Sequence, residues 1–243
     1  MVDETRPDPD ALLRVAEKEQ SMKGRLKVFF GMAAGVGKTF SMLKEGRQKK
    51  EEGVDVVIGY LESHQRKETD DLAAGIEIVP RMTLEYRGKM LQEMDLDAVL
   101  LRRPGLVLVD ELAHTNAPGA RNRKRYQDVL ELIDHGIEVF TTVNVQHLEG
   151  FADTVEEITG ITIAERIPDS VFDTAETVVL IDISPEELLK RLAEGKVYLG
   201  ERAQSAAENF FKKSTLTALR EMALRHTALL VTHQLATYAQ EHS

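Results

Sequence analysis

The stretch LKVFFGMAAGVGKT, residues 26–39, decides the fold that we expect for this chain. Its apolar start, Leu26–Phe30, predicts a β-strand, and its last residues, 37–39, predict the start of a helix. The residues between them are mostly small, so consecutive backbone N–H groups can curl around phosphate oxygens, while the helix N-terminus adds partial positive charge. The stretch therefore predicts a phosphate-binding loop between a strand and a helix.

Each residue of this loop has a predicted role. Lys38 is a predicted catalytic residue because its amino group can reach the β- and γ-phosphates, and the Thr39 hydroxyl is a predicted Mg²⁺ ligand. Met32 stands where the pattern G-x-x-x-x-G-K-[ST] has its first glycine, with Gly31 one residue too early. A chance glycine turn is the alternative interpretation. The residues predicted to contact nucleotide here are Gly31, Met32, Ala33, Ala34, Gly35, Val36, Gly37, Lys38 and Thr39.

Composition limits the classes of protein to consider. The 243 residues, 42% hydrophobic and 30% charged, suffice for one α/β domain with a small appendage. A net charge of −10 argues against a general nucleic-acid or acidic-membrane binder. The absence of cysteine excludes disulfides and thiolate metal sites. No run approaches the ~20 apolar residues of a membrane span, and the acidic N-terminus is no signal peptide, so we expect a cytoplasmic protein.

Apolar runs alternate with helical segments along the chain. Continuous apolar strands are typical of a parallel sheet that is covered on both faces. We therefore predict an α/β fold of the P-loop NTPase type, mainly a parallel sheet with helices on both faces and a C-terminal helical appendage. The further predicted strands are Val54–Leu61, Ile76–Val79, Leu106–Val109, Ile137–Val143 and Val178–Ile183.

Three segments are predicted. Residues 1–22 form a tail and helix, 23–200 the nucleotide-binding domain, and 201–243 a helical segment that could connect to a downstream domain. Within the last, Thr215–Gln240 predicts an amphipathic helix that serves as core, as a dimer seam or as a connector. One face of this helix is predicted to carry Leu219, Met222, Ala223, His226, Leu229, Leu230, His233 and Ala236.

A second group of chemical residues follows the strand LVLV at 106–109. Asp110 is predicted to hold Mg²⁺ near the loop, through water, and Glu111 to orient or deprotonate an attacking water as the second catalytic residue. The alternative is an acidic pair that merely ends a strand. Thr142, Asn144 and Gln146 lie at the tip of the next predicted strand. There, a γ-phosphate contact and ordinary strand-end polarity are equally good interpretations of these polar side chains.

Arg121, Arg123, Lys124 and Arg125 form a basic cluster after the predicted turn at Pro118-Gly119. One of them could act as an arginine finger on a neighbouring subunit's nucleotide. A solvated basic face is the favoured interpretation. The guanine-specifying pattern N-K-x-D is absent, which favours ATP over GTP.

Six segments together are similar to the N-terminal cytoplasmic domain of the KdpD family of bacterial sensor histidine kinases. They are GMAAGVGKTFSML, ESHQRKET, LVLVDELAHTNAPGARNRKRYQDV, TTVNVQHLEGFAD, ITGITIAERIPDSV and NFFKKSTLTALREMALR. The resemblance covers about Lys23 to Arg225, with Gly31–Thr39 matching the family's Walker A segment and Val107–Glu111 its Walker B segment.

This resemblance implies an ATP-binding regulatory module of a two-component sensor that responds to potassium limitation and osmotic stress. It implies partners as well: the remaining domains of the sensor, and through them a KdpE-like response regulator whose phosphorylation balance the module tunes. No phosphoacceptor-histidine helix pair is found, so at most slow ATP hydrolysis is expected, and a homodimer is a further expectation.

The alternatives are a metabolic P-loop kinase resembling thymidine kinase, a free-standing ATPase, and an oligomerising scaffold with a vestigial site. The kinase ranks behind because such enzymes usually carry a cysteine zinc cluster and an aromatic pair after the acidic pair. Here there are no cysteines, and residues 112–114 read LAH.

Overall fold

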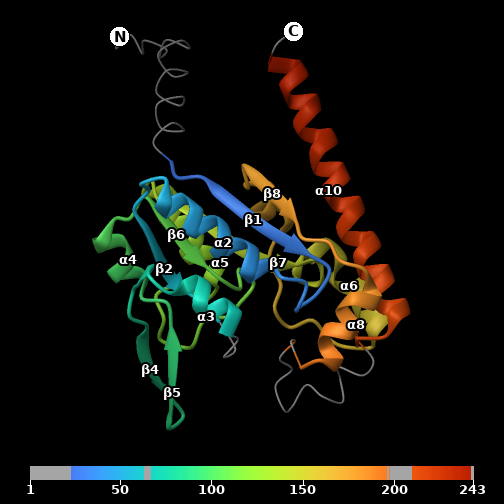
Figure 1. Ribbon diagram of the computed structural model, residues 1–243, viewed down its shortest axis with the longest axis horizontal. Helices are drawn as coiled ribbons and strands as arrows, with labels where there is room; N and C mark the ends of the chain where they lie inside the picture. Colours follow the sequence, from blue (N-terminus) through green and yellow to red (C-terminus); the bar gives the residue numbers. More distant parts are fainter. Residues whose placement is uncertain (1–22, 63–66, 196, 198–209, 242–243) are drawn as a thin grey trace, which may run out of the picture.

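A six-stranded sheet forms the centre of the computed structural model, which describes residues 23–62, 67–195, 197 and 210–241 (Figure 1). The strand order is β3-β2-β6-β7-β1-β8, and all neighbouring strands pair in parallel. The strands are β1 (Leu26–Gly31), β2 (Val56–Tyr60), β3 (Glu77–Ile78), β6 (Leu106–Val109), β7 (Glu138–Asn144) and β8 (Thr177–Leu180). The parallel α/β fold expected from the apolar runs is confirmed.

Helices cover both faces of this sheet. One face packs against α2 (Lys38–Glu51) and α3 (Lys67–Ala73). The opposite face packs against α4 (Leu96–Arg102), α5 (Arg125–Asp134), α6 (Glu149–Thr159), α7 (Asp169–Asp173) and α10 (Lys213–Glu241). Two further helical elements lie beside these layers: the short 3₁₀ helix η1 (Val145–His147) directly after β7, and α8 (Pro185–Ala193), which packs against α10.

The alternation of side chains explains why both faces are apolar. Phe29 of β1 and Phe140 of β7 lie in the cluster beneath α2, whereas Val28 and Phe30 of β1 lie in the larger cluster on the opposite face. Successive strand residues point to opposite faces, so a strand that is buried on both sides must be apolar throughout.

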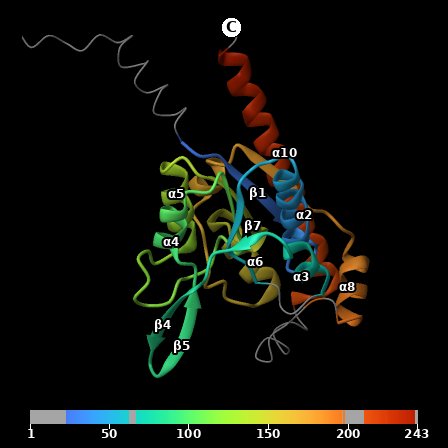
Figure 2. The same ribbon diagram turned by 60° about the vertical axis from the view of Figure 1, so that its left-hand side comes forward.

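A two-stranded hairpin was not predicted from the sequence. Its strands, β4 (Met82–Tyr86) and β5 (Lys89–Glu93), pair antiparallel and project away from the sheet (Figures 1 and 2). The turn residues Arg87 and Gly88 have φ of 51° and 74°. Positive φ at both central residues is typical of a type I′ turn. The usual sequence signals for this turn are Asn-Gly and Asp-Gly, so Arg-Gly did not indicate it.

The C-terminal helix differs in part from its prediction. Leu219 and Ala223 are buried as expected, and Met222 and Leu230 pack partly against the core. Leu229, which is predicted on the same face, is 66% exposed, so it does not pack against the core of this chain. The predicted face also included His233 and Ala236, whose side chains lie outside the described residues, as does the predicted tail at 1–22.

Among the described residues, no helix combines the length and the apolar character that crossing a bilayer requires, and this includes the 29-residue α10.

Candidate functional site

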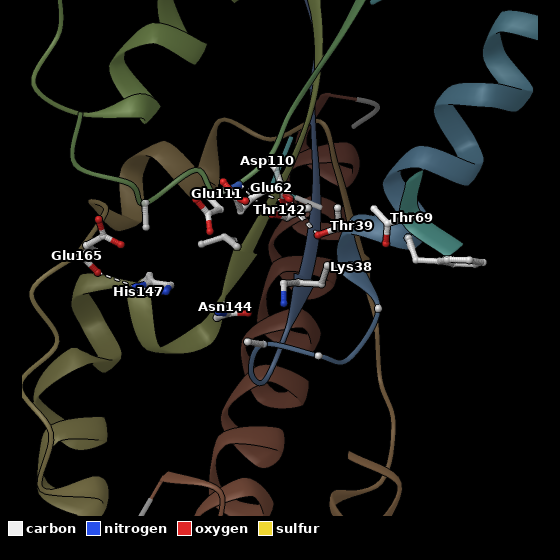
Figure 3. Close-up of a pocket in the computed structure, with 16 residues that line it drawn as sticks. Lys38, Thr39, Glu62, Thr69, Asp110, Glu111, Thr142, Asn144, His147 and Glu165 are labelled. Carbon is white, nitrogen blue, oxygen red and sulfur yellow. Dashed lines mark hydrogen bonds between the residues drawn. The ribbon is translucent and has the colours of Figure 1, made fainter. Parts of the chain in front are cut away.

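The strand order brings the two predicted groups of residues together. Strand β7 lies between β1 and β6, so the C-terminal ends of all three strands meet at one edge of the sheet. A cavity of about 150 Å³ opens there (Figure 3). The predicted residues that line it are Ala34, Gly35, Gly37, Lys38, Thr39, Asp110, Glu111, Thr142 and Asn144.

The loop after β1 has the backbone that an anion site needs. Gly37 has φ of 108° and is the N-cap of α2, a conformation that favours glycine. Among the described residues, the N–H groups of Gly35, Gly37 and Thr39 donate to no backbone carbonyl or side chain. Lys38 is 8% exposed, and its Nζ donates to the Ala33 carbonyl oxygen at 2.9 Å. The loop therefore offers backbone donors beside a nearly buried cation.

Four predicted loop residues, Gly31, Met32, Ala33 and Val36, do not line the cavity. Met32, Ala33 and Val36 are buried in the core. A Cβ on Gly31 would lie 2.8 Å from Val36 Cγ2 and 3.1 Å from the Ile181 carbonyl oxygen, so this position requires glycine. Gly31, which lies one residue before the usual position of the first glycine, thus allows Val36 and the Ile181 backbone to pack closely against it. Met32 fills apolar space beneath the loop.

Asp110 meets the loop from β6. The Thr39 hydroxyl donates to Asp110 Oδ2 at 3.1 Å, and the Thr142 hydroxyl donates to Asp110 Oδ1. Asp110 is buried, so two hydroxyl groups fix its carboxylate at the floor of the cavity. Hydroxyl and carboxylate oxygens are the ligands that Mg²⁺ prefers, and the pair fits an ion that also keeps several waters.

Glu111 has a left-handed backbone, with φ of 60°. Such a conformation costs a non-glycine residue on the order of 1–3 kcal/mol and persists only where surrounding contacts hold it. Here the Glu111 N–H donates to Thr142 Oγ1 at 3.1 Å and to Asp110 Oδ1 at 3.2 Å. Burial and the neighbouring charge of Asp110 raise the pKa of the Glu111 carboxyl. A carboxylate with a raised pKa accepts protons more readily, as a general base must.

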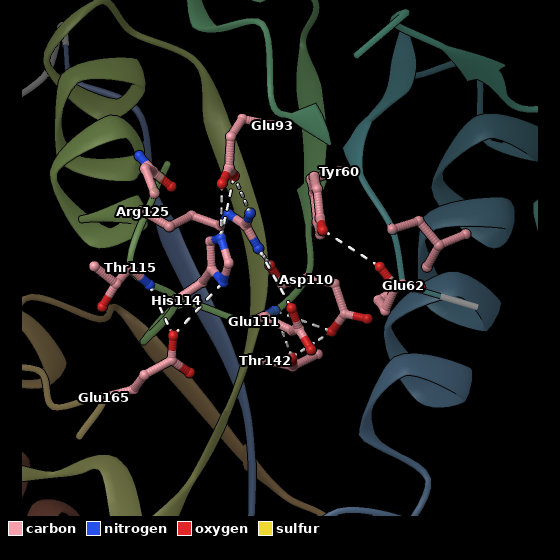
Figure 4. A network of polar contacts seen from close by, with 12 residues as sticks. Tyr60, Glu62, Glu93, Asp110, Glu111, His114, Thr115, Arg125, Thr142 and Glu165 are labelled. Carbon is pink, nitrogen blue, oxygen red and sulfur yellow. Dashed lines mark hydrogen bonds and ion pairs between the residues drawn. The ribbon is translucent and has the colours of Figure 1, made fainter. Parts of the chain in front are cut away.

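Arg125 lies at the centre of a buried polar network behind Glu111 (Figure 4). Its guanidinium is fully buried and lies 3.6 Å above the centre of the Tyr60 ring. It donates to Glu93 Oε2 at 3.0 Å and to the Asp110 carbonyl oxygen at 3.2 Å. It also lies 3.6 Å from Glu111 Oε2. Glu93, at the end of the unpredicted hairpin, also binds His114 Nε2 at 3.1 Å. Burial opposes ionisation of Glu93, but the bond to His114 and the neighbouring cations lower its pKa overall.

The basic cluster is therefore not one solvated face. Arg125 is enclosed by its own chain, which is incompatible with a role as an arginine finger on a neighbour. Arg121 is exposed and pairs with Asp97 and Glu131, as a surface cation would. Lys124 Nζ donates to Thr115 Oγ1 at 2.7 Å, and Arg123 is exposed.

The polar residues at the tip of β7 divide into two groups. Asn144 lines the cavity, and its Oδ1 is buried without a hydrogen-bond partner among the described residues. Gln146, on η1, does not line the cavity, and its Oε1 is likewise unpartnered within that part of the chain. The structure therefore places Asn144, but not Gln146, at the wall where a ligand would bind.

Several cavity residues were missed from the sequence: Phe40, Glu62, Thr69, His147 and Glu165. Glu62 follows β2, and ligands of open α/β sheets bind at the carboxyl ends of the strands, so a signal for it existed. His147 lies three residues after Asn144, so the same strand end could have indicated that its side chain lies near the cavity. Nothing in the local sequence pattern around Glu165 points to the cavity, because only tertiary packing brings that loop to it.

Comparison with known proteins identifies relatives over most of the chain. A family model described as "Osmosensitive K+ channel His kinase sensor domain" (KdpD) matches residues 22–231. Sensor protein KdpD of Escherichia coli is 51% identical over 233 residues, 96% of this chain and 26% of that protein. The corresponding protein of Clostridium acetobutylicum is 53% identical over 225 residues, 92% of this chain and 25% of its own length. The chain thus spans about a quarter of the length of these relatives.

Proposed function

The chain belongs to the KdpD family as the sensor domain of a potassium sensor kinase, and from this premise and the geometry of the site we propose that it binds ATP with Mg²⁺. The site is the cavity between the loop after β1 and the acids after β6. Turnover at this site is expected to be slow.

One observation carries the proposal. The Thr39 hydroxyl and the Asp110 carboxylate lie 3.1 Å apart in a cavity where backbone N–H groups at the N-terminus of α2 have no hydrogen-bond partner among the described residues. Such N–H groups bind anions, and the oxygen pair suits a divalent cation. A nucleoside triphosphate with Mg²⁺ supplies both charges at adjacent positions, together with a phosphoryl group that water can attack.

Each residue has a definite task in this proposal. Lys38 exchanges the Ala33 carbonyl for phosphate oxygens, and Thr39 and Asp110 hold the metal ion directly or through water. Glu111 orients the attacking water and accepts its proton, while Arg125 keeps the Glu111 side chain in place from behind. Asn144 Oδ1 is buried without a partner among the described residues, so it can accept a hydrogen bond from a water molecule that binds together with the nucleotide.

Occupancy of the site would matter to the whole sensor. We propose that the domain modulates the balance between kinase and phosphatase activity toward a KdpE-like response regulator. In a full-length sensor that carries this domain, Lys38→Ala should change the ATP dependence of that balance. Equal ATP dependence with and without the substitution would refute the regulatory part of the proposal.

Isothermal titration tests the binding itself. ATP, ADP and GTP, each with Mg²⁺, are titrated into the wild-type chain, Lys38→Ala and Lys44→Ala. Lys44 is a matched control because it lies on the same helix and is exposed. A charge-assisted hydrogen bond contributes about 1.5–3 kcal/mol, so Lys38→Ala should weaken ATP binding roughly 10- to 100-fold. Lys44→Ala should bind as the wild type does.

Two results would contradict the proposal. The wild type could fail to bind ATP, or Lys38→Ala could bind as tightly as Lys44→Ala. Phosphorylation of a nucleoside added with ATP would instead support the metabolic-kinase alternative.

A further inference from the structure

His147 is a titratable side chain that the proposed reaction does not use. It is the last residue of η1, lies between Glu165 and Asn144, and lines the same cavity as Lys38 (Figure 3). Its Nδ1 lies 2.7 Å from the Glu165 carbonyl oxygen.

This contact assigns the tautomer of the ring. A carbonyl oxygen can only accept, so Nδ1 carries the hydrogen, and in the neutral ring Nε2 is then an acceptor. The two ring nitrogens point in widely different directions, so Nε2 is directed away from Glu165. Within the part of the chain that the structure describes, the ring's hydrogen bond is the one through Nδ1, and Nε2 makes none.

The surroundings keep the ring neutral in the free protein. Burial lowers the pKa of His147, and the positive charges of Lys38 and Lys124 act in the same direction, whereas the bond to Glu165 opposes them. Among the described residues, the charged or titratable groups around this cavity are Lys38, Glu62, Asp110, Glu111, His114, Lys124 and Glu165.

A triphosphate would reverse this balance. Its oxygens are acceptors, so a neutral Nε2 acceptor facing them would be desolvated and repelled. The negative charge of the triphosphate also offsets the positive charge of Lys38, which lowers the pKa of His147 in the free protein. Protonation of Nε2 turns the repulsion into a charge-assisted hydrogen bond, the stronger kind.

We propose that His147 takes up one proton from solvent when a nucleoside triphosphate with Mg²⁺ binds, and that the Nε2–H then donates to a terminal phosphate oxygen. This inference rests on the proposed function and adds to it a coupling between nucleotide binding and pH. The coupling changes no covalent bond of the nucleotide, because the only step is a proton transfer in which hydronium or a buffer acid loses the proton and an N–H bond forms at Nε2.

Calorimetry measures the proton directly. MgATP is titrated into the wild-type chain near neutral pH in several buffers that differ in their enthalpy of ionisation, with Mg²⁺ in excess so that the nucleotide itself does not titrate. The slope of the binding enthalpy against the buffer enthalpy gives the number of protons taken up. We expect an uptake approaching about one proton, and an affinity that falls by up to about tenfold per pH unit at alkaline pH.

His147→Asn is the informative variant because its amide can still donate to the Glu165 carbonyl but cannot titrate. The matched control is His135→Asn, since His135 Nδ1 also bonds to a backbone carbonyl, that of Glu131 at 2.8 Å, yet is exposed at the end of α5. Proton uptake should disappear in His147→Asn and persist in His135→Asn.

The outcomes separate the two proposals. ATP binding without proton uptake, or with uptake that survives in His147→Asn, overturns this inference and leaves the proposed function intact. Absence of ATP binding overturns both. Nitrogen-15 spectra of the wild-type histidine rings give an independent readout without any variant. They should show His147 protonated at Nδ1 alone in the free protein and at both nitrogens with ATP bound.

Discussion

Arg125→Met tests whether the buried network behind Glu111 holds the site together. The substitution removes a guanidinium that is fully buried and leaves Glu93, whose side chain is 6% exposed, without this cation. Loss of one partner from a buried ion pair typically costs about 3–5 kcal/mol. We expect the lower end, about 3 kcal/mol, because His114 and the Ala117 N–H still bind Glu93.

Urea denaturation followed by circular dichroism measures this cost. For a chain of this size, about 3 kcal/mol corresponds to a melting temperature lower by roughly 6–12 °C. Arg121→Met is the matched control. The ion pairs that this arginine makes within the described residues lie at the surface, so its loss should cost at most about 1 kcal/mol after screening by solvent.

A double variant makes the test sharper. If the cost of Arg125→Met comes from an unpaired buried carboxylate, adding Glu93→Gln should recover at least about 1 kcal/mol. The reasoning is refuted if Arg125→Met costs no more than Arg121→Met, or if the second substitution only adds to the loss.

Three further outcomes are expected. Glu111→Gln should bind ATP within about threefold of the wild type and lose any phosphate release by roughly 100-fold or more; an unchanged rate would exclude Glu111 as the base. His226 packs among Phe30, Phe151 and Phe172, and burial lowers its pKa, so the free energy of unfolding should fall as pH drops below about 6.5. His226→Phe should flatten that slope by up to about 1.4 kcal/mol per pH unit in urea titrations, and an unchanged slope would contradict this. Ser184→Ala should cost about 1 kcal/mol in the same assay, because the Ser184 hydroxyl accepts from the Glu187 N–H at 3.1 Å at the start of α8; a neutral effect would argue against the cap.

The parts of the fold predicted from sequence are those with a local cause. Leu106–Val109 was predicted with its exact bounds because a strand buried on both faces must be apolar at every position. The start of α2 at Lys38 follows from the glycine before it, and Ser184, Pro185 and Glu187 are equally local signals for the start of α8. Each of these signals lies within a few residues of the feature that it specifies.

The missed parts have causes that lie elsewhere in the chain. Glu93 ends an exposed hairpin, and only the folded chain shows that it pairs with Arg125 from a helix 32 residues later. Arg125 belonged to a run of basic residues that suggested a solvated face, and its burial depends on the ring of Tyr60 at the end of β2. Glu165 reaches the cavity from the segment after α6, where no strand or helix periodicity marks it.

The departures from ordinary protein structure gather around a single cavity. Glu111 has a left-handed backbone and a carboxyl whose pKa is raised by burial and by Asp110, and Asn144 Oδ1 is buried without a partner among the described residues. His147 is held neutral beside the nearly buried Lys38. Such costs persist in a folded protein when a ligand compensates them, and they are therefore expected at a functional site. The acids of the cavity favour a bound cation, whereas the lysine and the backbone amides favour a bound anion. A ligand that contains both a cation and an anionic group would therefore offset most of these costs at once.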